Sequence, residues 1–234
     1  MKENNKQFKI KETVFVQNDI KVIERCITQR GELQLQKRNQ DYEIISNGVF
    51  LMSTYNGDSE RKLVSMALKF SSNPQKVLVA GLGVGYSLQE MLDETEVKEV
   101  VVLELEAKII EWNYNYFSPL MGNYLKDSRI RIIQQDLLTW LDSAEDKFDT
   151  VCIDIDNGPE WTVMESNCRL YTEKGLYSLS KILNPYGVVS FWSSSSSVNF
   201  HNRLKQYFCN VKEYQVQSMR GAPDYIYLGQ NYKR

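Results

Sequence analysis

The spacing of hydrophobic residues changes once along the chain, near residue 58. Before this point apolar and polar residues mostly alternate in short segments, which the turn-forming pairs ND, RG and NG separate. A period of two residues is typical of β-strands with one buried face. The segments are 12–17, 21–29, 32–38 and 42–52. We therefore expect a small N-terminal antiparallel β domain over residues 1–57.

Beyond residue 58, segments with helical periodicity alternate with segments that are apolar almost throughout. The apolar segments are suited to strands of a parallel sheet that is covered on both faces. They are KVLVAG (76–81), VKEVVVLELE (97–106), RIRIIQQD (129–136), FDTVCIDID (148–156) and YGVVSFW (186–192). The helical segments are 58–70, 86–94, 107–117, 136–145 and 170–183, the last one expected to end at Asn184 and Pro185. Asp58 or Ser59 is expected to cap the first helix.

This alternation predicts an α/β fold with a doubly wound, mostly parallel sheet over residues 58–234. A further helix is expected around 199–208. After it, VKEYQVQSM (211–219) and DYIYLGQ (224–230) are joined by the turn RGAP. We expect these two segments to pair as a C-terminal antiparallel hairpin at the edge of the sheet.

Composition and charge exclude several classes of partner. The 234 residues carry a formal net charge of −2, with no basic stripe, so we do not expect a nucleic acid partner. No stretch approaches the ~18 apolar residues of a membrane span, and the N-terminus lacks the apolar core of a signal peptide. We therefore expect a cytoplasmic protein. Its N-terminal β region is rich in apolar residues, which favours a homodimer.

Metal chemistry is not expected either. The four cysteines lie far apart in the sequence, at positions 26, 152, 168 and 209. The only histidine, His201, has no cysteine or carboxylate at the spacing of metal ligands. Most simply, His201 is a surface residue of the helix expected around 199–208.

The turn after the segment 76–80 carries three alternating glycines, Gly81, Gly83 and Gly85. A glycine-rich turn between a strand and a helix lets a ligand approach the backbone, because no side chain blocks it. However, the pattern G-x-G-x-G lacks the last position of the dinucleotide fingerprint G-x-G-x-x-G. A tight turn without a ligand is therefore an alternative interpretation.

Two acidic residues at the ends of the next two strands favour a nucleoside ligand. Glu104 follows Gly81 by 23 residues, close to the ~20 at which an acid meets ribose hydroxyls in nucleotide-binding βαβ units. Asp136 ends the following strand and is placed to accept a hydrogen bond from the exocyclic amine of a base. Either acid alone is equally consistent with a solvated strand end or a helix cap. Together with the glycines, they favour an adenosine-type ligand at the carboxyl ends of the strands.

Several motifs together resemble class I S-adenosylmethionine-dependent transferases, and more narrowly spermidine synthase and its relatives. They are VLVAGLGVGYSLQE (77–90), LELE (103–106), QQDLL (134–138), FDTVCIDIDNGP (148–159) and LYTEKGLYSLSKILNPYGVVSFW (170–192). The segment YEIISNGVFLM (42–52) is similar to that family's small N-terminal domain, so the resemblance covers most of the chain.

The resemblance implies a sulfonium donor, either S-adenosylmethionine or decarboxylated S-adenosylmethionine, and no metal. It places the glycines 81, 83 and 85 under the donor, Glu104 on the ribose and Asp136 near the adenine. It also implies that Asp154, which ends the fourth strand, faces the amine that attacks the donor.

The reaction type explains why a carboxylate is needed near the amine. A sulfonium is already activated for displacement, so the enzyme mainly positions the nucleophile and controls its proton. An acceptor amine arrives protonated, and Asp154 is placed to bind the ammonium and to take or relay its proton. Asp156 and Glu160 add negative charge nearby. Trp161 offers an aromatic face to a cation, although it is equally consistent with a lid or core aromatic.

The chain departs from the family pattern at several positions. Val84 stands where polyamine aminopropyltransferases carry an acid that meets the amine of the donor's aminopropyl group. Asn157 replaces the second acid after the fourth strand, and Asp156 is expected to point to the other side if the strand persists. Tyr42 and Glu43 stand where the family has an aromatic residue and a glutamine near the substrate. We count Tyr42, Glu43, Asp156, Asn157 and Trp161 as candidate substrate-binding residues.

Three interpretations of the function follow. The first is an S-adenosylmethionine-dependent, methyltransferase-like enzyme acting on a small amine or polar acceptor, which Val84 favours because a methyl donor has no aminopropyl ammonium to bind. The second is a polyamine aminopropyltransferase with an altered acceptor, which the N-terminal domain and Asp154 favour. The third is a non-catalytic nucleoside-binding protein that has kept the fold and lost its activity.

Overall fold

The computed structural model describes residues 19–217 and 221–233. The strand predicted at 12–17 lies outside these residues. The chain divides into two compact units, residues 1–51 and 52–234. The prediction places the division after residue 57, whereas the segment 52–57 belongs to the second unit in the structure.

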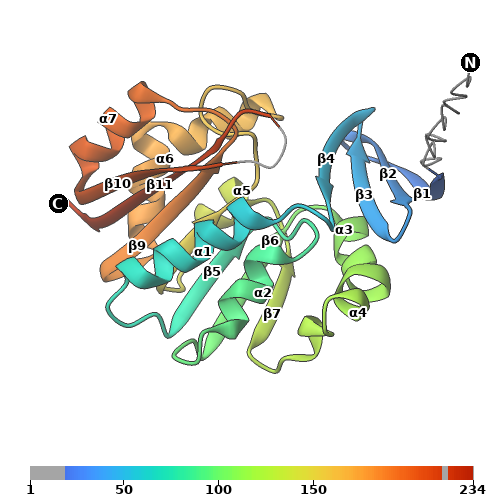
Figure 1. Ribbon diagram of the computed structural model, residues 1–234. Helices are drawn as coiled ribbons and strands as arrows, with labels where there is room; N and C mark the ends of the chain where they lie inside the picture. The colour runs from blue at the N-terminus through green and yellow to red at the C-terminus, as the bar shows by residue number, and fades with distance from the viewer. Residues whose placement is uncertain (1–18, 218–220, 234) are drawn as a thin grey trace, which may run out of the picture. The chain divides into compact units, whose positions relative to one another are not determined.

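The first unit is built on an antiparallel sheet whose strands pair in chain order (Figure 1). Its strands are β1 (Ile20–Thr28), β2 (Gly31–Arg38), β3 (Asp41–Ser46) and β4 (Val49–Ser53). Leu35 and Ile44 pair across β2 and β3, and both are fully buried. The turn between β3 and β4 is Asn47–Gly48, where both residues have positive φ. This is the hairpin that an Asn-Gly pair favours.

The second unit contains a seven-stranded sheet in the order β10-β11-β9-β8-β5-β6-β7. Its strands are β5 (Lys76–Ala80), β6 (Glu99–Glu104), β7 (Ile130–Gln134), β8 (Phe148–Ile153), β9 (Leu183–Ser193), β10 (Phe208–Val216) and β11 (Asp224–Tyr232). Strand β11 runs antiparallel to both of its neighbours, β10 and β9, and the pairings among β9, β8, β5, β6 and β7 are parallel. The predicted α/β class, with a mostly parallel sheet and a C-terminal antiparallel hairpin, is therefore confirmed.

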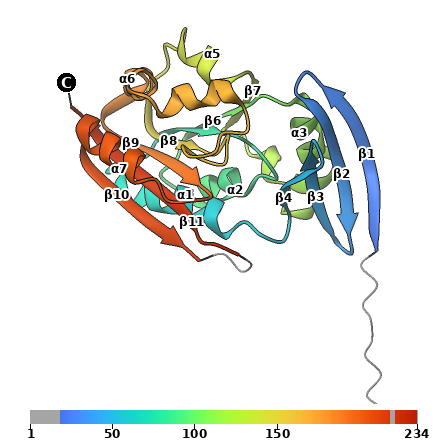
Figure 2. The same ribbon diagram turned by 90° about the horizontal axis from the view of Figure 1, so that it is seen from above.

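Helices cover both faces of this sheet (Figure 2). Helices α1 (Asp58–Phe70) and α2 (Tyr86–Asp93) pack together on one face, and α5 (Leu137–Leu141), α6 (Glu173–Lys181) and α7 (Val198–Tyr207) lie on the other. The shorter elements are α3 (Ala107–Trp112), the π-helix η1 (Asn113–Phe117), α4 (Ser118–Leu120) and the 3₁₀-helices η2 (Tyr124–Lys126) and η3 (Glu165–Tyr171). None of the described helices is long and apolar enough to cross a membrane.

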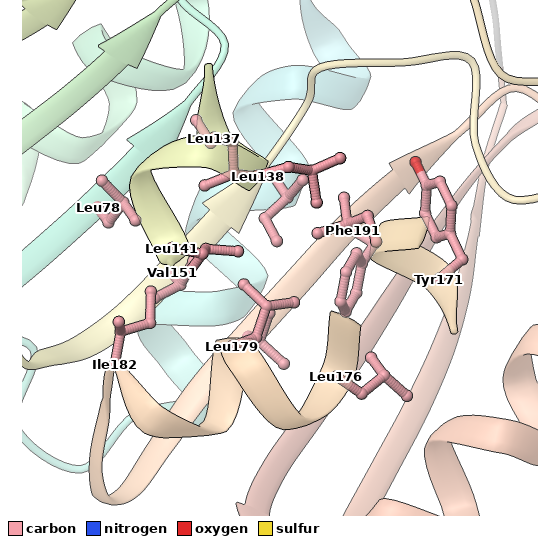
Figure 3. Close-up of a cluster of buried hydrophobic side chains, with 14 of the residues drawn as sticks. Leu78, Leu137, Leu138, Leu141, Val151, Tyr171, Leu176, Leu179, Ile182 and Phe191 are labelled. Carbon is pink, nitrogen blue, oxygen red and sulfur yellow. The ribbon is translucent and has the colours of Figure 1, made fainter. Parts of the chain in front are cut away.

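The core beneath α5 and α6 shows why these segments are helical. Their apolar residues recur at spacings of three or four, which puts them on one side of each helix. This side meets the apolar side chains of the central strands (Figure 3). The cluster includes Leu137, Leu138 and Leu141 of α5, Leu176 and Leu179 of α6, and Leu78, Val151 and Phe191 of the sheet.

The predicted cap of the first helix is wrong. Helix α1 begins after Gly57, and no side chain makes a capping hydrogen bond there. A β-carbon at residue 57 would lie 2.1 Å from the ring of Tyr86. Packing of this ring therefore selects glycine at the cap position, and Asp58 already lies in the first turn, where an acid interacts favourably with the helix dipole.

The predicted end of the helix at 170–183 is also wrong. Helix α6 ends at Lys181, and Asn184 and Pro185 belong to the start of β9. The register between β8 and β9 shifts here, and regular pairing resumes at Val188. Pro185 is tolerated because it lies in this irregular part, where the missing N–H is not needed for the ladder.

Candidate active site at the carboxyl ends of β5, β6 and β8

The strand order has a topological switch point at β5. The chain passes from β5 to β6 and β7 on one side, and then returns to β8 on the other side of β5. In open α/β sheets, ligands bind beyond the carboxyl ends of the strands at such a switch point. Gly81 directly follows β5, Glu104 ends β6 and Asp154 directly follows β8. The structure thus brings the predicted glycine turn and two of the predicted acids to one edge of the sheet.

The glycine turn is closely packed against protein atoms. All three glycines have positive φ, and a β-carbon on any of them would clash. The nearest atoms would be the Asp154 carbonyl oxygen at Gly81 (2.0 Å), Met52 Sδ at Gly83 (2.5 Å) and the Tyr124 hydroxyl at Gly85 (2.0 Å). The packing of the turn alone therefore accounts for the glycine pattern. The glycines by themselves therefore do not indicate a ligand.

Glu104 connects two backbone segments of the site. Its side chain is only 7% exposed. Oε2 accepts a hydrogen bond from the Leu82 N–H at 2.9 Å, and Oε1 accepts one from the Glu106 N–H at 2.8 Å. Each carboxylate oxygen has two lone pairs, so these bonds do not exclude hydroxyl donors from a ribose. The predicted role of Glu104 is compatible with its role in fixing the loop.

Asp136 is the N-cap residue of α5. Its Oδ1 accepts hydrogen bonds from the backbone N–H of Thr139 at 2.8 Å and from the Thr139 hydroxyl at 2.9 Å. The helix cap that the sequence left open as an alternative is therefore present. A contact of Asp136 with an adenine stays a prediction.

Asp154 lies among other carboxylates. Burial raises the pKa of Asp154 well above its usual range, and the negative charges of Glu60, Asp224 and Glu104 raise it further. Burial also raises the pKa of Glu60 and that of Asp224. Such a group of acids disfavours further negative charge and favours a positively charged ligand.

Glu60 and Asp224 were not among the residues predicted from sequence. Glu60 lies in the first turn of α1, and Asp224 opens β11. Because β11 is antiparallel to β9, its first residues lie beside the last residues of β9, as the pairing of Tyr225 with Ser193 shows. The predicted C-terminal hairpin does not by itself place Asp224, because the sequence does not say which of its two strands pairs with β9 or in which direction.

The loop after β8 holds three predicted substrate-binding residues. Asp156 is buried, and its Oδ1 accepts hydrogen bonds from the backbone N–H groups of Asn157 and Val163. The Asn157 carbonyl accepts hydrogen bonds from the backbone and hydroxyl of Ser194. Trp161 is 59% exposed, which rules out a core aromatic. Asp156 and Asn157 thus shape this loop, and their contact with a substrate stays a prediction.

The predicted residues of the first unit do not act as a pair. Tyr42 and Glu43 are neighbours on β3, so their side chains point to opposite faces of the sheet. Glu43 is 2% exposed and accepts hydrogen bonds from Gln36 Nε2 at 2.5 Å and Arg38 Nε at 2.7 Å. The Lys37 ammonium lies 5.4 Å from the centre of the Tyr42 ring. One ligand therefore cannot meet both side chains on the same face of this sheet.

Within residues 19–217 and 221–233, no group of three or more histidine, cysteine, aspartate or glutamate side chains is arranged to hold a metal ion. His201 lies on α7, as predicted, and its Nδ1 is 2.7 Å from Glu213 Oε2. This contact connects α7 to β10.

Comparison with known sequences finds a family match and distant relatives. Residues 58–228 match the family model described as the spermine/spermidine synthase domain. A polyamine aminopropyltransferase of Pyrobaculum calidifontis is 26% identical over 178 residues, which cover 71% of this chain and 61% of the relative. A polyamine aminopropyltransferase of Korarchaeum cryptofilum is 31% identical over 137 residues, which cover 58% of this chain and 41% of the relative. The chain thus spans less than two thirds of the length of these relatives.

Solved structures share the fold. A spermidine synthase in complex with the transition state analogue AdoDATO has a TM-score of 0.76 at 17% identity, covering 90% of this chain and 73% of that one. The spermidine synthase from Thermotoga maritima has a TM-score of 0.73 at 16% identity, covering 90% and 72%. The methyltransferase-like interpretation, placed first from the sequence, is not supported by these comparisons, which fit the aminopropyltransferase alternative better. Because the matched residues 58–228 make up most of the chain, this protein belongs to the spermine/spermidine synthase domain family.

Proposed function

We propose that this chain is a polyamine aminopropyltransferase, which moves the aminopropyl group of decarboxylated S-adenosylmethionine to an aliphatic amine. The observation that carries the proposal is the group of carboxylates formed by Glu60, Asp154 and Asp224. Donor and acceptor of this reaction both carry ammonium groups, which such carboxylates stabilise. S-adenosylmethionine itself also carries a carboxylate on its amino-acid tail, which the same acids would repel. The electrostatics therefore favour the decarboxylated donor over a methyl donor.

Val84 is compatible with this proposal. Its side chain is fully buried, and its backbone groups are bound by protein: the N–H by Met52 Sδ at 3.1 Å and the carbonyl by the Tyr124 hydroxyl at 3.0 Å. The valine therefore serves the packing of the loop. Glu60 and Asp224 supply the negative charge that the loop itself lacks.

The proposed reaction is a displacement at carbon. The acceptor nitrogen attacks the aminopropyl carbon bound to sulfur, so that the C–N bond forms as the C–S bond breaks. Methylthioadenosine leaves with the electron pair of the broken bond. Asp154 holds the acceptor ammonium and takes its proton, a role that its raised pKa suits, because a base works best with a pKa closer to the working pH.

The direct test is calorimetric titration of the purified chain with methylthioadenosine and, separately, S-adenosylhomocysteine. These by-products of aminopropyl and methyl transfer share the adenosine and differ in the charged amino-acid tail. We expect tighter binding of methylthioadenosine, and turnover of decarboxylated S-adenosylmethionine with linear aliphatic diamines. Tighter binding of S-adenosylhomocysteine would contradict the proposal in favour of methyl transfer. Nucleoside binding without turnover would favour the non-catalytic interpretation.

Glu60→Gln should raise the stability of the protein at neutral pH. Burial raises the pKa of Glu60, so the folded chain keeps this proton to a higher pH than the unfolded chain. The free energy of unfolding therefore falls as pH rises from about 4 through the folded pKa. Glutamine does not ionise, so the stability advantage of the variant is absent near pH 3 and grows as the pH rises through the folded pKa of Glu60. Thermal unfolding near pH 3 and at neutral pH measures it.

The same variant tests the ammonium site. We expect Glu60→Gln to raise the KM for decarboxylated S-adenosylmethionine about tenfold, since a charge-assisted contact is lost. The Kd of methylthioadenosine, which has no ammonium group, should stay close to that of the wild type. Glu111→Gln is the matched control, because Glu111 is an exposed helical glutamate. A lower Tm at neutral pH together with an unchanged KM would contradict the role of Glu60.

A further inference from the structure

We propose that Asn113 and Tyr124 are positioning residues of the donor site, acting as one hydrogen-bonded unit that fixes the glycine turn 81–85. The inference rests on the proposed function, since it concerns the same nucleoside site. Neither residue lies in a motif that carried the sequence analysis. Both come from the segment between β6 and β7, and both contact the loop after β5.

Asn113 connects the glycine turn to the helix that follows β6. The residue is fully buried at the first position of the π-helix η1. Its Nδ2 donates hydrogen bonds to the Gly83 carbonyl at 2.7 Å and to the Ile109 carbonyl at 2.8 Å. The side-chain amide has two N–H groups, so it satisfies both carbonyls at once. Its oxygen is then directed to the remaining neighbour, Tyr124.

Tyr124 completes the unit. Its hydroxyl contacts Asn113 Oδ1 and lies 3.0 Å from the Val84 carbonyl oxygen. Both neighbours are acceptors, so the hydroxyl must keep its proton and share it between them. Burial raises the pKa of Tyr124 above its ordinary value, which keeps the hydroxyl protonated. The unit is uncharged and does not titrate near neutral pH.

The unit fixes two successive peptide groups of the turn, whose N–H ends are also bound. The Val84 N–H donates to Met52 Sδ at 3.1 Å, and the Gly85 N–H donates to the Leu82 carbonyl at 2.8 Å. Each peptide plane is therefore held at its carbonyl end by the unit and at its N–H end by the turn or by Met52. The Leu82 N–H in turn binds Glu104, the predicted ribose ligand. A shift of the turn would move this carboxylate.

Two local features place the unit. Helix α3 widens into the π-helix η1 at Asn113, a rare geometry that is frequent at functional sites. At the other end of the contact, Gly85 leaves room for Tyr124, since a β-carbon there would lie 2.0 Å from the tyrosine hydroxyl. The last glycine of the turn is thus accounted for by the approach of Tyr124.

The ordered turn should affect nucleoside binding more than the rate of the chemical step. A turn that is already ordered loses less conformational freedom when the nucleoside binds, so it binds more tightly than a loose one. Loosening the unit should therefore weaken nucleoside binding, although both side chains are buried. The rate at saturating donor should change much less, because Asp154 lies on another element.

The test uses Tyr124→Phe, Asn113→Ala and the double variant. Tyr124→Phe removes only the hydroxyl and keeps the ring. We expect each single substitution to raise the Kd of methylthioadenosine about tenfold in calorimetric titration, since buried acceptors lose their donor. In the double variant the Kd should again rise about tenfold, and not by the product of the two single effects, because substitutions within one hydrogen-bonded unit are not additive. We expect KM for the donor to rise while kcat stays within about threefold of the wild type.

Tyr227→Phe is the matched control. Tyr227 is also buried, and its hydroxyl accepts a hydrogen bond from the Ser197 N–H, away from the glycine turn. Circular dichroism checks that each variant is folded; if Asn113→Ala is not, the comparison of Tyr124→Phe with Tyr227→Phe decides. An unchanged Kd in folded Tyr124→Phe, or an equal loss of nucleoside affinity in Tyr227→Phe, would overturn this inference and leave the proposed function standing. A wild-type chain that binds no nucleoside would refute the proposed function and this inference with it.

Discussion

Asp154→Asn should lower turnover by about 10²–10⁴-fold, the usual contribution of a general acid or base, while nucleoside binding is retained. The amide has nearly the shape of the carboxyl group but cannot take a proton from the attacking amine. Desolvation and the negative charges of Glu60, Asp224 and Glu104 raise the pKa of Asp154. The variant should therefore be no less stable than the wild type, because it removes one charge from a group of like charges.

Three measurements on Asp154→Asn separate the possible outcomes. Turnover with decarboxylated S-adenosylmethionine and a diamine reports the chemistry, the Kd of methylthioadenosine reports the nucleoside site, and thermal unfolding reports the fold. Asp142→Asn is the control, since Asp142 is an exposed aspartate at the end of α5. Equal rates of wild type and variant would remove Asp154 from the mechanism. A large loss of nucleoside affinity would assign it to donor binding instead.

Glu104→Ala should weaken the binding of methylthioadenosine by a few kcal/mol and also destabilise the fold. Two N–H groups, of Leu82 and Glu106, lose a carboxylate acceptor, and each such charge-assisted bond is worth about 1.5–3 kcal/mol. If Glu104 also binds the ribose, the hydroxyl contacts are lost in addition. Calorimetry and denaturant unfolding measure the two effects separately.

A 2′-deoxy analogue of methylthioadenosine isolates the ribose contact. The wild type should discriminate against the analogue, and the discrimination should largely disappear in Glu104→Ala, whatever the general loss of affinity. Glu99→Ala is the control on the same strand, because Glu99 begins β6 and Glu104 ends it. Discrimination that persists unchanged in folded Glu104→Ala would show that another residue binds the ribose.

Many helices and strands of the second unit could be predicted from the sequence, because the spacing of their apolar residues identifies them. Helix α1 has the bounds predicted for it, 58–70, because its apolar residues recur with a clear helical period. The central strands were identifiable because both of their faces are buried. The end of α6 was missed because Pro185 was interpreted as a helix terminator, whereas the irregular start of β9 accommodates it.

The residues of the candidate site also fall into those that the sequence could place and those that it could not. Gly81, Glu104 and Asp154 could be placed because topology alone brings the carboxyl ends of parallel strands together. Asn113 and Asp224 could not, since one depends on a π-helical turn and the other on the register of an antiparallel strand. Both features are set by packing between distant segments, which a local pattern does not contain.

The place of β11 in the sheet makes the proposed amine site depend on the pairing of the C-terminal strands. Although β11 follows β10 in the chain, it lies between β10 and β9. The strand β10 is therefore joined to the rest of the sheet through β11 alone. Asp224 opens this strand, so the negative charge proposed to hold the ammonium group is in place only when β11 is paired with β9. A chain in which β11 has left the sheet would thus lack this part of the amine site, even with the strands that carry Glu104 and Asp154 intact.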